Sequence, residues 1–191
     1  MNKLTIYIDM DGVVADFDKA AREHPDFGKK GFRPDLTLDF TKLEPIEGAI
    51  ESVNALVKEG HDVLFASTAP WDYPQSWAQK RIWIAKYFPK MRKKLILTAR
   101  KDLLIGDILI DDHAWNGAKE FTGQWFHFGK DGMDWKYIME TIKSIMTVGK
   151  VWIKEDTLSE TGVKVTEGFL SHNLRKSKNS NTSRGDYVLD N

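Results

Sequence analysis

The sequence predicts an α/β fold built on a central parallel sheet with helices on both of its faces. Short apolar runs rich in β-branched residues alternate along the chain with segments whose apolar residues recur at helical spacing. Strands that are buried on both faces have this continuous apolar character, and parallel pairing requires a long crossover after a strand. A chain of 191 residues also fits one main domain with a single core.

Five strands account for the short apolar runs. They are expected at residues 4–9, 63–66, 95–97, 108–110 and 125–128. The first, second and fourth runs end abruptly in polar residues, which are the carboxyl ends of the predicted strands. The carboxyl ends of parallel strands lie along one edge of a sheet, and ligands of open α/β sheets bind there.

Four helices and one irregular insertion connect these strands. The helices are expected at residues 14–24, 47–59, 75–88 and 135–146. The second has a stripe of apolar residues that Gly60 ends, and Pro89 stops the third. Residues 25–45 contain several prolines and glycines and have no sustained period, so they are expected to form an irregular insertion between two core elements.

The C-terminal residues 147–191 are predicted to form an extension outside the core. Residues 151–165 are compatible with a hairpin around Ser159-Glu160-Thr161-Gly162. Residues 171–185 contain one aliphatic side chain among Ser, Asn, Lys and Arg. Such a segment buries too little apolar surface to offset its ordering entropy, and it is expected to be mobile unless a partner holds it.

Composition excludes several classes of function. The chain has 28 Lys and Arg, 28 Asp and Glu and no cysteine. Without cysteine there are no disulfides, thiolate metal sites or cysteine nucleophiles, and the balanced charge argues against a nucleic-acid partner. No apolar run approaches the ~20 residues of a membrane helix, and Asp9 interrupts the first apolar stretch, so neither a membrane partner nor a signal peptide is expected. A cytoplasmic location is the expectation.

The first predicted strand delivers Asp9 and Asp11, followed by Gly12. Two carboxylates this close raise the cost of ionising both, unless a cation lies between them. A hard cation such as Mg²⁺, which prefers oxygen ligands, would resolve that conflict. The alternative is an ordinary Asx turn at a strand end.

Polar residues also follow the next three strands. Ser67-Thr68 suits phosphate oxygens but equally a turn or helix cap, and Arg100-Lys101 suits an anion but equally a solvated surface. Asp111-Asp112, preceded by Asp107, would be costly at a buried strand end without a counter-charge. In a parallel sheet all of these groups gather at one edge, with an excess of acidic residues. Their order therefore predicts a Mg²⁺-dependent phosphoryl-transfer site.

These motifs resemble those of the haloacid dehalogenase-like (HAD) phosphatase superfamily. The segment Asp9-Met-Asp-Gly-Val-Val-Ala-Asp-Phe17 resembles its first motif, and Ser67, Lys101 and Asp111-Asp112 resemble the other three. Residues 43–49, 86–88, 96–101 and 108–112 further resemble the 5′(3′)-deoxyribonucleotidases. The resemblance implies a three-layer α/β/α Rossmann-like HAD core over residues 1–146, with a small, reduced cap insertion at about 18–44 that is shorter than expected for that family.

The resemblance also implies catalytic roles. Asp9 would be the nucleophile that forms an aspartyl-phosphate, and Asp11 the general acid and base. Mg²⁺ would be held by the Asp9 carboxylate, the Asp11 backbone carbonyl and Asp112, while Asp111 would orient the metal or its waters. Ser67 and Lys101, with backbone N–H groups near Met10 and Thr68, would hold the phosphate oxygens.

Aromatic side chains are candidates for contact with a nucleotide base. The family places an aromatic at the position of Phe17, and Phe32, Trp71 and Tyr73 are further candidates. Most aromatic residues in the chain are expected to be core instead. The residues assigned to the core are Trp77, Trp83, Trp125 and Trp135. Among the five histidines, only His113 is expected near the site.

The function expected from the sequence is hydrolysis of nucleoside monophosphates, chiefly pyrimidine deoxyribonucleotides, by a Mg²⁺-dependent phosphatase. Two alternatives stay open. The same site could act on another small phosphomonoester, such as a sugar phosphate or a nucleic-acid end, or the chain could be a non-catalytic nucleotide-binding protein of this fold. A homodimer, in which residues 147–191 contact a neighbouring subunit, is also left open.

Overall fold

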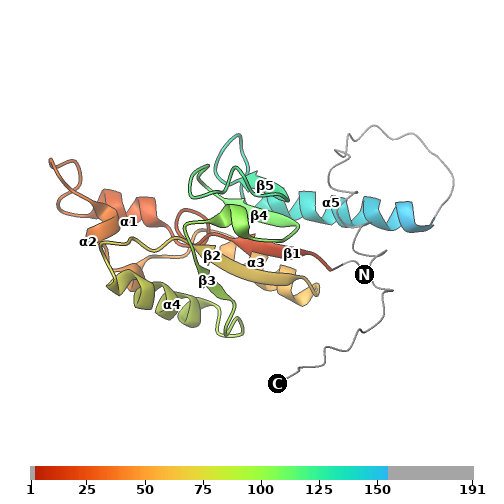
Figure 1. Cartoon of the computed structure of the whole chain (residues 1–191), viewed down its shortest axis with the longest axis horizontal. Coiled ribbons are helices and arrows are strands. Elements are labelled where there is room, and N and C mark those ends of the chain that lie inside the picture. The colour runs from red at the N-terminus through yellow and green to blue at the C-terminus, as the bar shows by residue number, and fades with distance from the viewer. Residues whose placement is uncertain (1–2, 155–191) are drawn as a thin grey trace, which may run out of the picture. The chain divides into compact units, whose positions relative to one another are not determined.

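The computed structural model describes residues 3–154 and contains one sheet of five parallel strands. The strands are β1 Thr5–Ile8, β2 Asp62–Ser67, β3 Leu95–Leu97, β4 Ile108–Asp111 and β5 Gln124–His127. Their order in the sheet is β3-β2-β1-β4-β5, and every pair is parallel. The chain therefore winds from β1 outward in one direction to β3, then returns to the other side of β1 for β4 and β5 (Figure 1). The α/β parallel-sheet prediction is confirmed, with each strand within a residue or two of its expected position.

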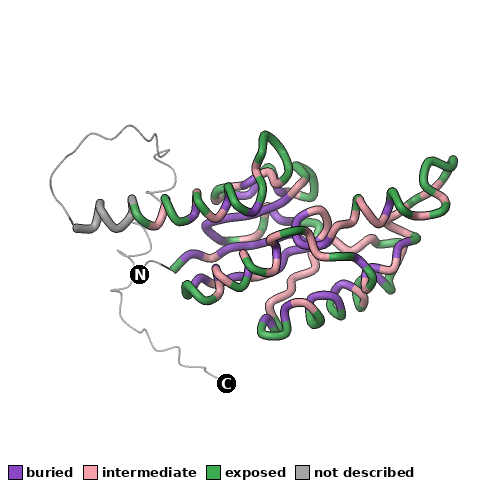
Figure 2. The backbone as a smooth tube through the Cα atoms, turned by 180° about the vertical axis from the view of Figure 1, so that it is seen from behind, coloured by how far each residue is buried: buried purple, intermediate pink, exposed green. Residues whose placement is uncertain are grey.

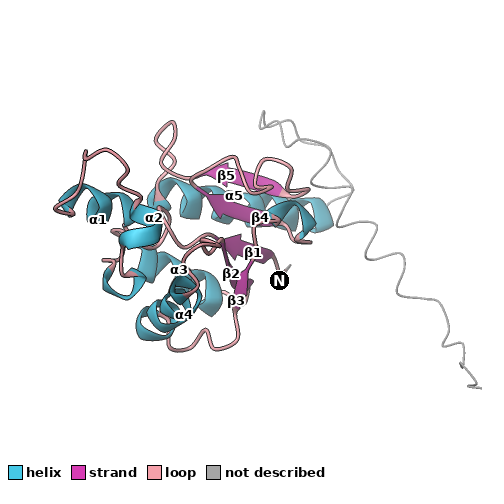
Figure 3. Cartoon of the chain, turned by 60° about the vertical axis from the view of Figure 1, so that its left-hand side comes forward, coloured by secondary structure: helices cyan, strands magenta, loops and turns pink. Residues whose placement is uncertain are grey.

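The two faces of the sheet are covered differently. Tyr7, Ala66 and Leu109 pack with Ala118 and Phe121 on one face, so this layer comes from the 3₁₀ turn η2 (Lys101–Leu103) and the turns between β4 and β5. Residues alternate along a strand, which turns the neighbours of Tyr7 to the opposite face. The helices α3 (Ala49–Lys58) and α5 (Trp135–Lys154) contact each other and cover that face (Figure 3).

The central strands are the most deeply buried part of the described chain (Figure 2). Ile6, Ile8 and Ile110 have no exposed surface, because they lie in inner strands with material on both faces. This explains why the sequence shows continuous apolar runs here rather than an alternating pattern. Helix α4 (Gln75–Tyr87) follows β2 and packs against the 3₁₀ turn η1 (Phe40–Lys42).

The insertion between β1 and β2 forms a small cap with short helices of its own. It contains α1 (Phe17–Glu23), α2 (Pro34–Thr37) and η1, where the sequence predicted one longer helix and an irregular stretch. Asp16 determines the later start of α1, because its side chain accepts a hydrogen bond from Lys19 N at 2.9 Å and caps the helix. In Figure 1, α1 and α2 lie beyond the carboxyl end of β1.

The cap leaves and re-enters the core through a narrow neck. Asp16 N donates to Glu44 O at 2.8 Å and Ile46 N donates to Val14 O at 2.9 Å, so the two crossing segments run side by side. Ala15 and Pro45 form an antiparallel bridge within this neck. The first and last residues of the insertion are therefore neighbours, directly after the turn that contains Asp11.

The helix after β5 is longer than the sequence analysis predicted. Helix α5 continues to Lys154, so the boundary expected at residues 146/147 falls inside it, and residues 151–154 are helical rather than part of a hairpin. Apolar residues at Ile142, Ile145, Met146, Trp152 and Ile153 extend the helical spacing across that boundary. The rest of the predicted hairpin and the polar stretch at 171–185 lie outside the described residues. Within the described part, no helix has the length and apolar character needed to cross a membrane.

Candidate active site

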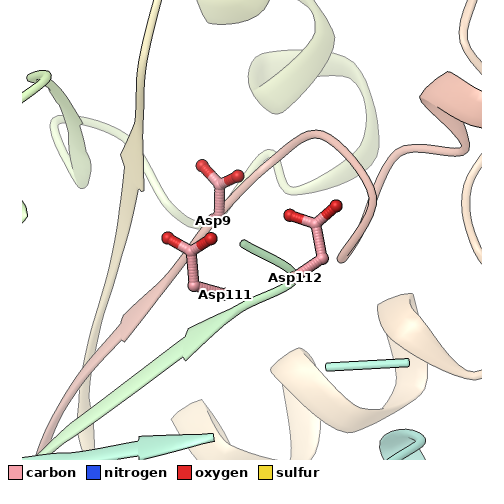
Figure 4. A group of neighbouring side chains, drawn as sticks. All are labelled: Asp9, Asp111 and Asp112. Atoms are coloured by element: carbon pink, nitrogen blue, oxygen red, sulfur yellow. The ribbon is translucent and has the colours of Figure 1, made fainter. Parts of the chain in front are cut away.

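Three carboxylates meet where β1 and β4 end. Asp9 directly follows β1, Asp111 is the last residue of β4, and Asp112 follows it. Their carboxylate oxygens lie within 4.8 Å of one another, and the side chains extend to the same side beyond the strands (Figure 4). The strand order reverses between β1 and β4, which is where ligands of such sheets bind. The predicted convergence of these three acids at one edge is therefore present in the fold.

The electrostatics of this trio call for a positive partner. Burial, together with the carboxylates of Asp9 and then Asp111, raises the pKa of Asp112 to about 8. Burial and Asp9 likewise raise the pKa of Asp111 to about 6, although Lys101 opposes the shift. Carboxylates this close are costly to ionise together unless a cation lies among them. Carboxylate oxygens are also the ligands that a hard cation such as Mg²⁺ prefers. The residues present thus fit the group that the sequence predicted.

Lys101 is the cation that the fold supplies at the trio. It begins η2, is 2% exposed, and its Nζ lies 3.0 Å from Asp9 Oδ1 and in contact with Asp111 Oδ2. Burial disfavours the charged ammonium, but Asp9 and Asp111 overcome this and raise the pKa of Lys101 above its ordinary value. Asp111 also accepts a hydrogen bond from His113 N at 3.0 Å, so both of its oxygens are engaged by the protein.

A tight turn brings Asp11 toward the same edge. Gly12 has a φ of 71°, and a Cβ added there would collide with the carboxylate of Asp112. Glycine is therefore favoured here both by the backbone conformation and by the close approach of the turn to the Asp112 side chain. Asp11 Oδ1 is buried and has no hydrogen-bond partner among the described residues, while its other oxygen contacts Lys80.

Lys80 is a member of the site that the sequence analysis missed. It lies on α4, is fully buried, and its Nζ contacts Asp11 Oδ2 and lies 2.9 Å from Ser67 Oγ. The expected helix was correct, but Lys80 was not singled out among its residues. Ser76, Lys80, Trp83 and Ile84 are the buried residues of α4 and recur at helical spacing. A lysine within a buried stripe is the signal that would have found it, because a buried ammonium needs a partner.

A cavity of about 380 Å³ opens onto these groups. Its lining includes Asp9, Asp11, Lys101, Asp111 and Asp112. Of the predicted substrate contacts, Phe17 and Thr68 also line it, whereas Ser67 and Trp71 do not. The Ser67 hydroxyl is fully buried against Lys80, and Trp71 is 85% exposed. Thr68 Oγ1 donates to Thr98 O at 2.9 Å, which fixes its side chain at the cavity wall.

The lining of the cavity also contains an aromatic pair that the sequence analysis did not identify as a pair. His113 was expected near the site, and its ring lies 4.2 Å from that of Trp115, measured between centroids. Both residues line the cavity, and Trp115 is 65% exposed. His127 was not expected, yet its Nε2 lies 2.8 Å from the backbone oxygen of Asp112. It is the last residue of β5 and lies opposite Asp111 of β4, so the register of the sheet brings it there.

Other sequence-based assignments fall away from the cavity. Asp107 precedes β4, and its carboxylate accepts a hydrogen bond from Thr5 N at 2.8 Å. It therefore lies at the amino end of the sheet, and the prediction that it belongs to the acidic edge was wrong. Arg100 is exposed and pairs with Asp102. Trp83 and Trp135 are core as expected, whereas Trp77 is 43% exposed and Trp125 is partly buried. Phe32 stacks on His24 inside the cap.

Comparison with known proteins places this arrangement in a family. A family model described as 5′ nucleotidase, deoxy (pyrimidine), cytosolic type C protein matches residues 31–131. A putative 5′(3′)-deoxyribonucleotidase of Vibrio phage KVP40 is 38% identical over 148 residues, which is 75% of this chain and 86% of the phage protein. The chain belongs to the 5′(3′)-deoxyribonucleotidase family. The human cytosolic-type 5′(3′)-deoxyribonucleotidase is 29% identical over 154 residues, covering 64% of this chain and 77% of the human protein.

Membership of this family indicates both the fold of the chain and its class of activity. The 5′(3′)-deoxyribonucleotidases are HAD-like phosphatases, and the five-stranded parallel sheet agrees with that fold. The mitochondrial human 5′(3′)-deoxyribonucleotidase is also similar, at 30% identity over 156 residues, or 65% of this chain and 68% of the human protein. The matched segment 31–131 contains Lys80, Lys101, Asp111 and Asp112. The chain is thus a nucleotidase-family phosphatase by sequence as well as by fold.

Proposed function

We propose that the protein removes the phosphate from nucleoside 5′-monophosphates, chiefly pyrimidine deoxyribonucleotides, through an aspartyl-phosphate on Asp9 with Mg²⁺ as cofactor. One observation carries the proposal. Asp9, Asp11 and Lys101 face a single cavity beside the carboxylates of Asp111 and Asp112. A nucleophile, a second acid and a buried cation within one concave site are the groups that phosphoryl transfer needs. The names of the relatives supply the substrate class.

The proposed reaction has two steps. A carboxylate oxygen of Asp9 attacks phosphorus while the bond from phosphorus to the ester oxygen breaks, and Asp11 gives its proton to that oxygen, which leaves as the nucleoside hydroxyl. Water then attacks the phosphorus of the aspartyl-phosphate and gives a proton to Asp11. The bond from phosphorus to Asp9 breaks, which releases inorganic phosphate and restores both acids. Burial raises the pKa of Asp11, against the opposing effect of Lys80, and this favours a protonated group at the start.

The acidic residues would hold the metal. Asp9 and Asp112 would bind it through their carboxylates and Asp11 through its backbone carbonyl, while Asp111, whose oxygens already contact Lys101 and His113 N, would orient the site. When bound, Mg²⁺ would screen the phosphate dianion from the attacking carboxylate. Lys101 adds a fixed positive charge at the same place, since its Nζ lies 3.0 Å from Asp9 Oδ1.

The remaining cavity walls would contact the rest of the nucleotide. Thr68 lines the cavity, whereas the hydroxyl of Ser67 is turned to Lys80, so Thr68 is the better candidate for a phosphate contact. Phe17 on the cap side and Trp115 on the β4 side offer flat apolar surfaces to a base. A cavity of about 380 Å³ is within the usual range for small-molecule sites. The cytoplasmic location and the homodimer stay predictions.

A substrate panel tests the proposal. Purified protein is incubated with Mg²⁺ and dUMP, dTMP, UMP, dAMP or a sugar phosphate, and phosphate release is measured. Pyrimidine deoxyribonucleotides are expected to react fastest, and Asp9→Asn is expected to lower kcat by about 10³-fold or more with unchanged circular dichroism. Release that survives unchanged in Asp9→Asn would rule out the covalent step. A preference for the sugar phosphate would keep the chemistry and overturn the substrate.

A further inference from the structure

We infer that Lys80 is a positioning residue that holds the carboxyl group of Asp11 in place for proton transfer to the leaving group. The inference rests on the proposed function, because Asp11 is the general acid only if the chain is a phosphatase of the proposed mechanism. It concerns a residue on α4, outside the strand ends that carry the motifs.

The ammonium of Lys80 has a complete set of contacts in a fully buried position. Nζ contacts Asp11 Oδ2, lies 2.9 Å from Ser67 Oγ, and lies 4.7 Å from the centre of the Phe40 ring. Lys80 has no exposed surface, although lysine is rarely buried completely unless it is paired. A carboxylate, a hydroxyl and an aromatic ring thus hold the ammonium in one place beside Asp11.

The helix that carries Lys80 is itself anchored on both sides of that residue. Gln79 Oε1 accepts a hydrogen bond from Phe40 N at 3.1 Å, and Trp83 Nε1 donates to Leu43 O at 2.8 Å. These bonds tie one face of α4 to the base of the cap. Because a rigid second layer of contacts fixes the orientation of a reacting group, the anchoring is transmitted through Lys80 to Asp11.

The two oxygens of Asp11 are consequently not equivalent. Oδ2 is held by Lys80, while Oδ1 has no hydrogen-bond partner among the described residues, and Asp11 lines the cavity. Lys80 therefore fixes the orientation of the Asp11 carboxyl group through Oδ2. Lys80 is itself neither a lining residue of the cavity nor a member of the trio of Asp9, Asp111 and Asp112, so it acts through Asp11.

Leaving groups of different acidity separate this role from a structural one. Phenyl phosphate and p-nitrophenyl phosphate are nearly identical in shape, but only the first needs a proton delivered to its leaving oxygen. In Lys80→Met, kcat with phenyl phosphate and with dUMP is expected to fall about 10- to 100-fold, which is part of the ~10²- to 10⁴-fold that a general acid contributes. The fall with p-nitrophenyl phosphate is expected to be no more than about threefold. The ratio of the two aryl rates does not depend on the fraction of folded protein.

An equal fall with both aryl phosphates would overturn the inference, because it would mean a loss of fold or of phosphate binding. The matched control is Lys86→Met on the exposed side of the same helix, which is expected to leave both rates unchanged. A second readout is dUMP turnover in an Asp11→Asn background, where adding Lys80→Met is expected to cost nothing further. Independent, multiplying losses in the double variant would also refute the positioning role.

Should Lys80→Met not fold, Ser67→Ala carries the same test. Removing the hydroxyl 2.9 Å from Lys80 Nζ loosens the ammonium without removing it, and a two- to fivefold loss confined to phenyl phosphate and dUMP is expected. A rise in KM that is equal for both aryl phosphates would instead make Ser67 a phosphate contact and contradict the inference. Absence of nucleotide turnover in the wild-type protein, with aryl phosphates still hydrolysed, would refute the proposed substrate and leave the Lys80 comparison intact.

Discussion

Binding of Mg²⁺ should depend steeply on pH, because Asp112 has to lose a proton to become a ligand. Its pKa of about 8 means that about 1% of Asp112 is ionised at pH 6 and half at pH 8. The apparent dissociation constant is therefore expected to be about 50-fold larger at pH 6 than at pH 8, from this group alone. Asp111, with a pKa of about 6, acts in the same direction at the lower end.

Isothermal titration of metal-free protein with Mg²⁺ measures this directly. Titrations at pH 6, 7 and 8 give the affinity, and buffers of different ionisation enthalpy give the number of protons released, which is expected to approach one at pH 6. Asp112→Asn is expected to bind more weakly and to lose most of the pH dependence. His113→Gln is a control for any contribution of the neighbouring imidazole, because His113 Nε2 lies 3.5 Å from Asp112 Oδ2.

Thermal unfolding gives the same prediction a second readout. The folded state raises the pKa of Asp112 above its unfolded value, so the protonated form is favoured on folding. Without metal, stability from this group is complete below about pH 4 and is lost as pH rises to about 8, by at most about 1.4 kcal/mol per pH unit. The gain in Tm on adding Mg²⁺ should accordingly be larger at pH 8 than at pH 6. An affinity and a Tm gain that do not change with pH would refute the reasoning.

Two further predictions concern the turn and the cavity wall. Gly12→Ala is expected to lower the free energy of unfolding, measured in urea, by about 1–3 kcal/mol and to weaken Mg²⁺ binding. The control is Gly28→Ala, because Gly28 has a φ of 79° but open space around it, so this variant should show backbone strain alone. Equal losses in both variants, with Mg²⁺ binding intact, would contradict the close approach to Asp112. Trp115→Ala is expected to raise KM for dUMP about fivefold with little change in kcat, and by more than Trp71→Ala, because only Trp115 lines the cavity. A larger effect at Trp71 would support the sequence-based assignment of Trp71 to the substrate and contradict the role given to Trp115.

The strand ends were predictable from sequence because two local patterns coincide there. Continuous apolar runs mark strands buried on both faces, and the polar residues follow such a run directly or, for Lys101, within four residues. Asp9, Lys101, Asp111 and Asp112 were found in this way, and the parallel topology then brings them to one edge. The same reasoning misplaced Asp107, because an acid that precedes a strand and one that follows it look alike in a short motif.

Residues outside the strand ends were harder to predict, because tertiary contacts determine their roles. Lys80 is 13 positions from Ser67 and 69 from Asp11, and nothing local to α4 reveals that its ammonium meets both. Trp71 and Trp115 each follow a strand-end motif, yet only the second lines the cavity. The continuation of α5 to Lys154 was missed because Gly149 interrupts the stripe without ending the helix.

The neck of the cap allows the cap to change in length without displacing the residues that follow β1. Its two crossing segments are hydrogen bonded side by side at Asp16–Glu44 and Val14–Ile46, so the loop between them starts and finishes at almost one point. Lengthening or shortening such a loop changes its closure entropy only slightly, about 0.6 kcal/mol for a doubling. Residues 17–39 can thus be replaced or resized while Asp9 and Asp11 keep their positions, as long as Phe40 and Leu43 keep their contacts with α4. A cap of this kind is a natural starting point for grafting caps from other members of the family, which would change the choice of substrate and leave the reacting groups in place.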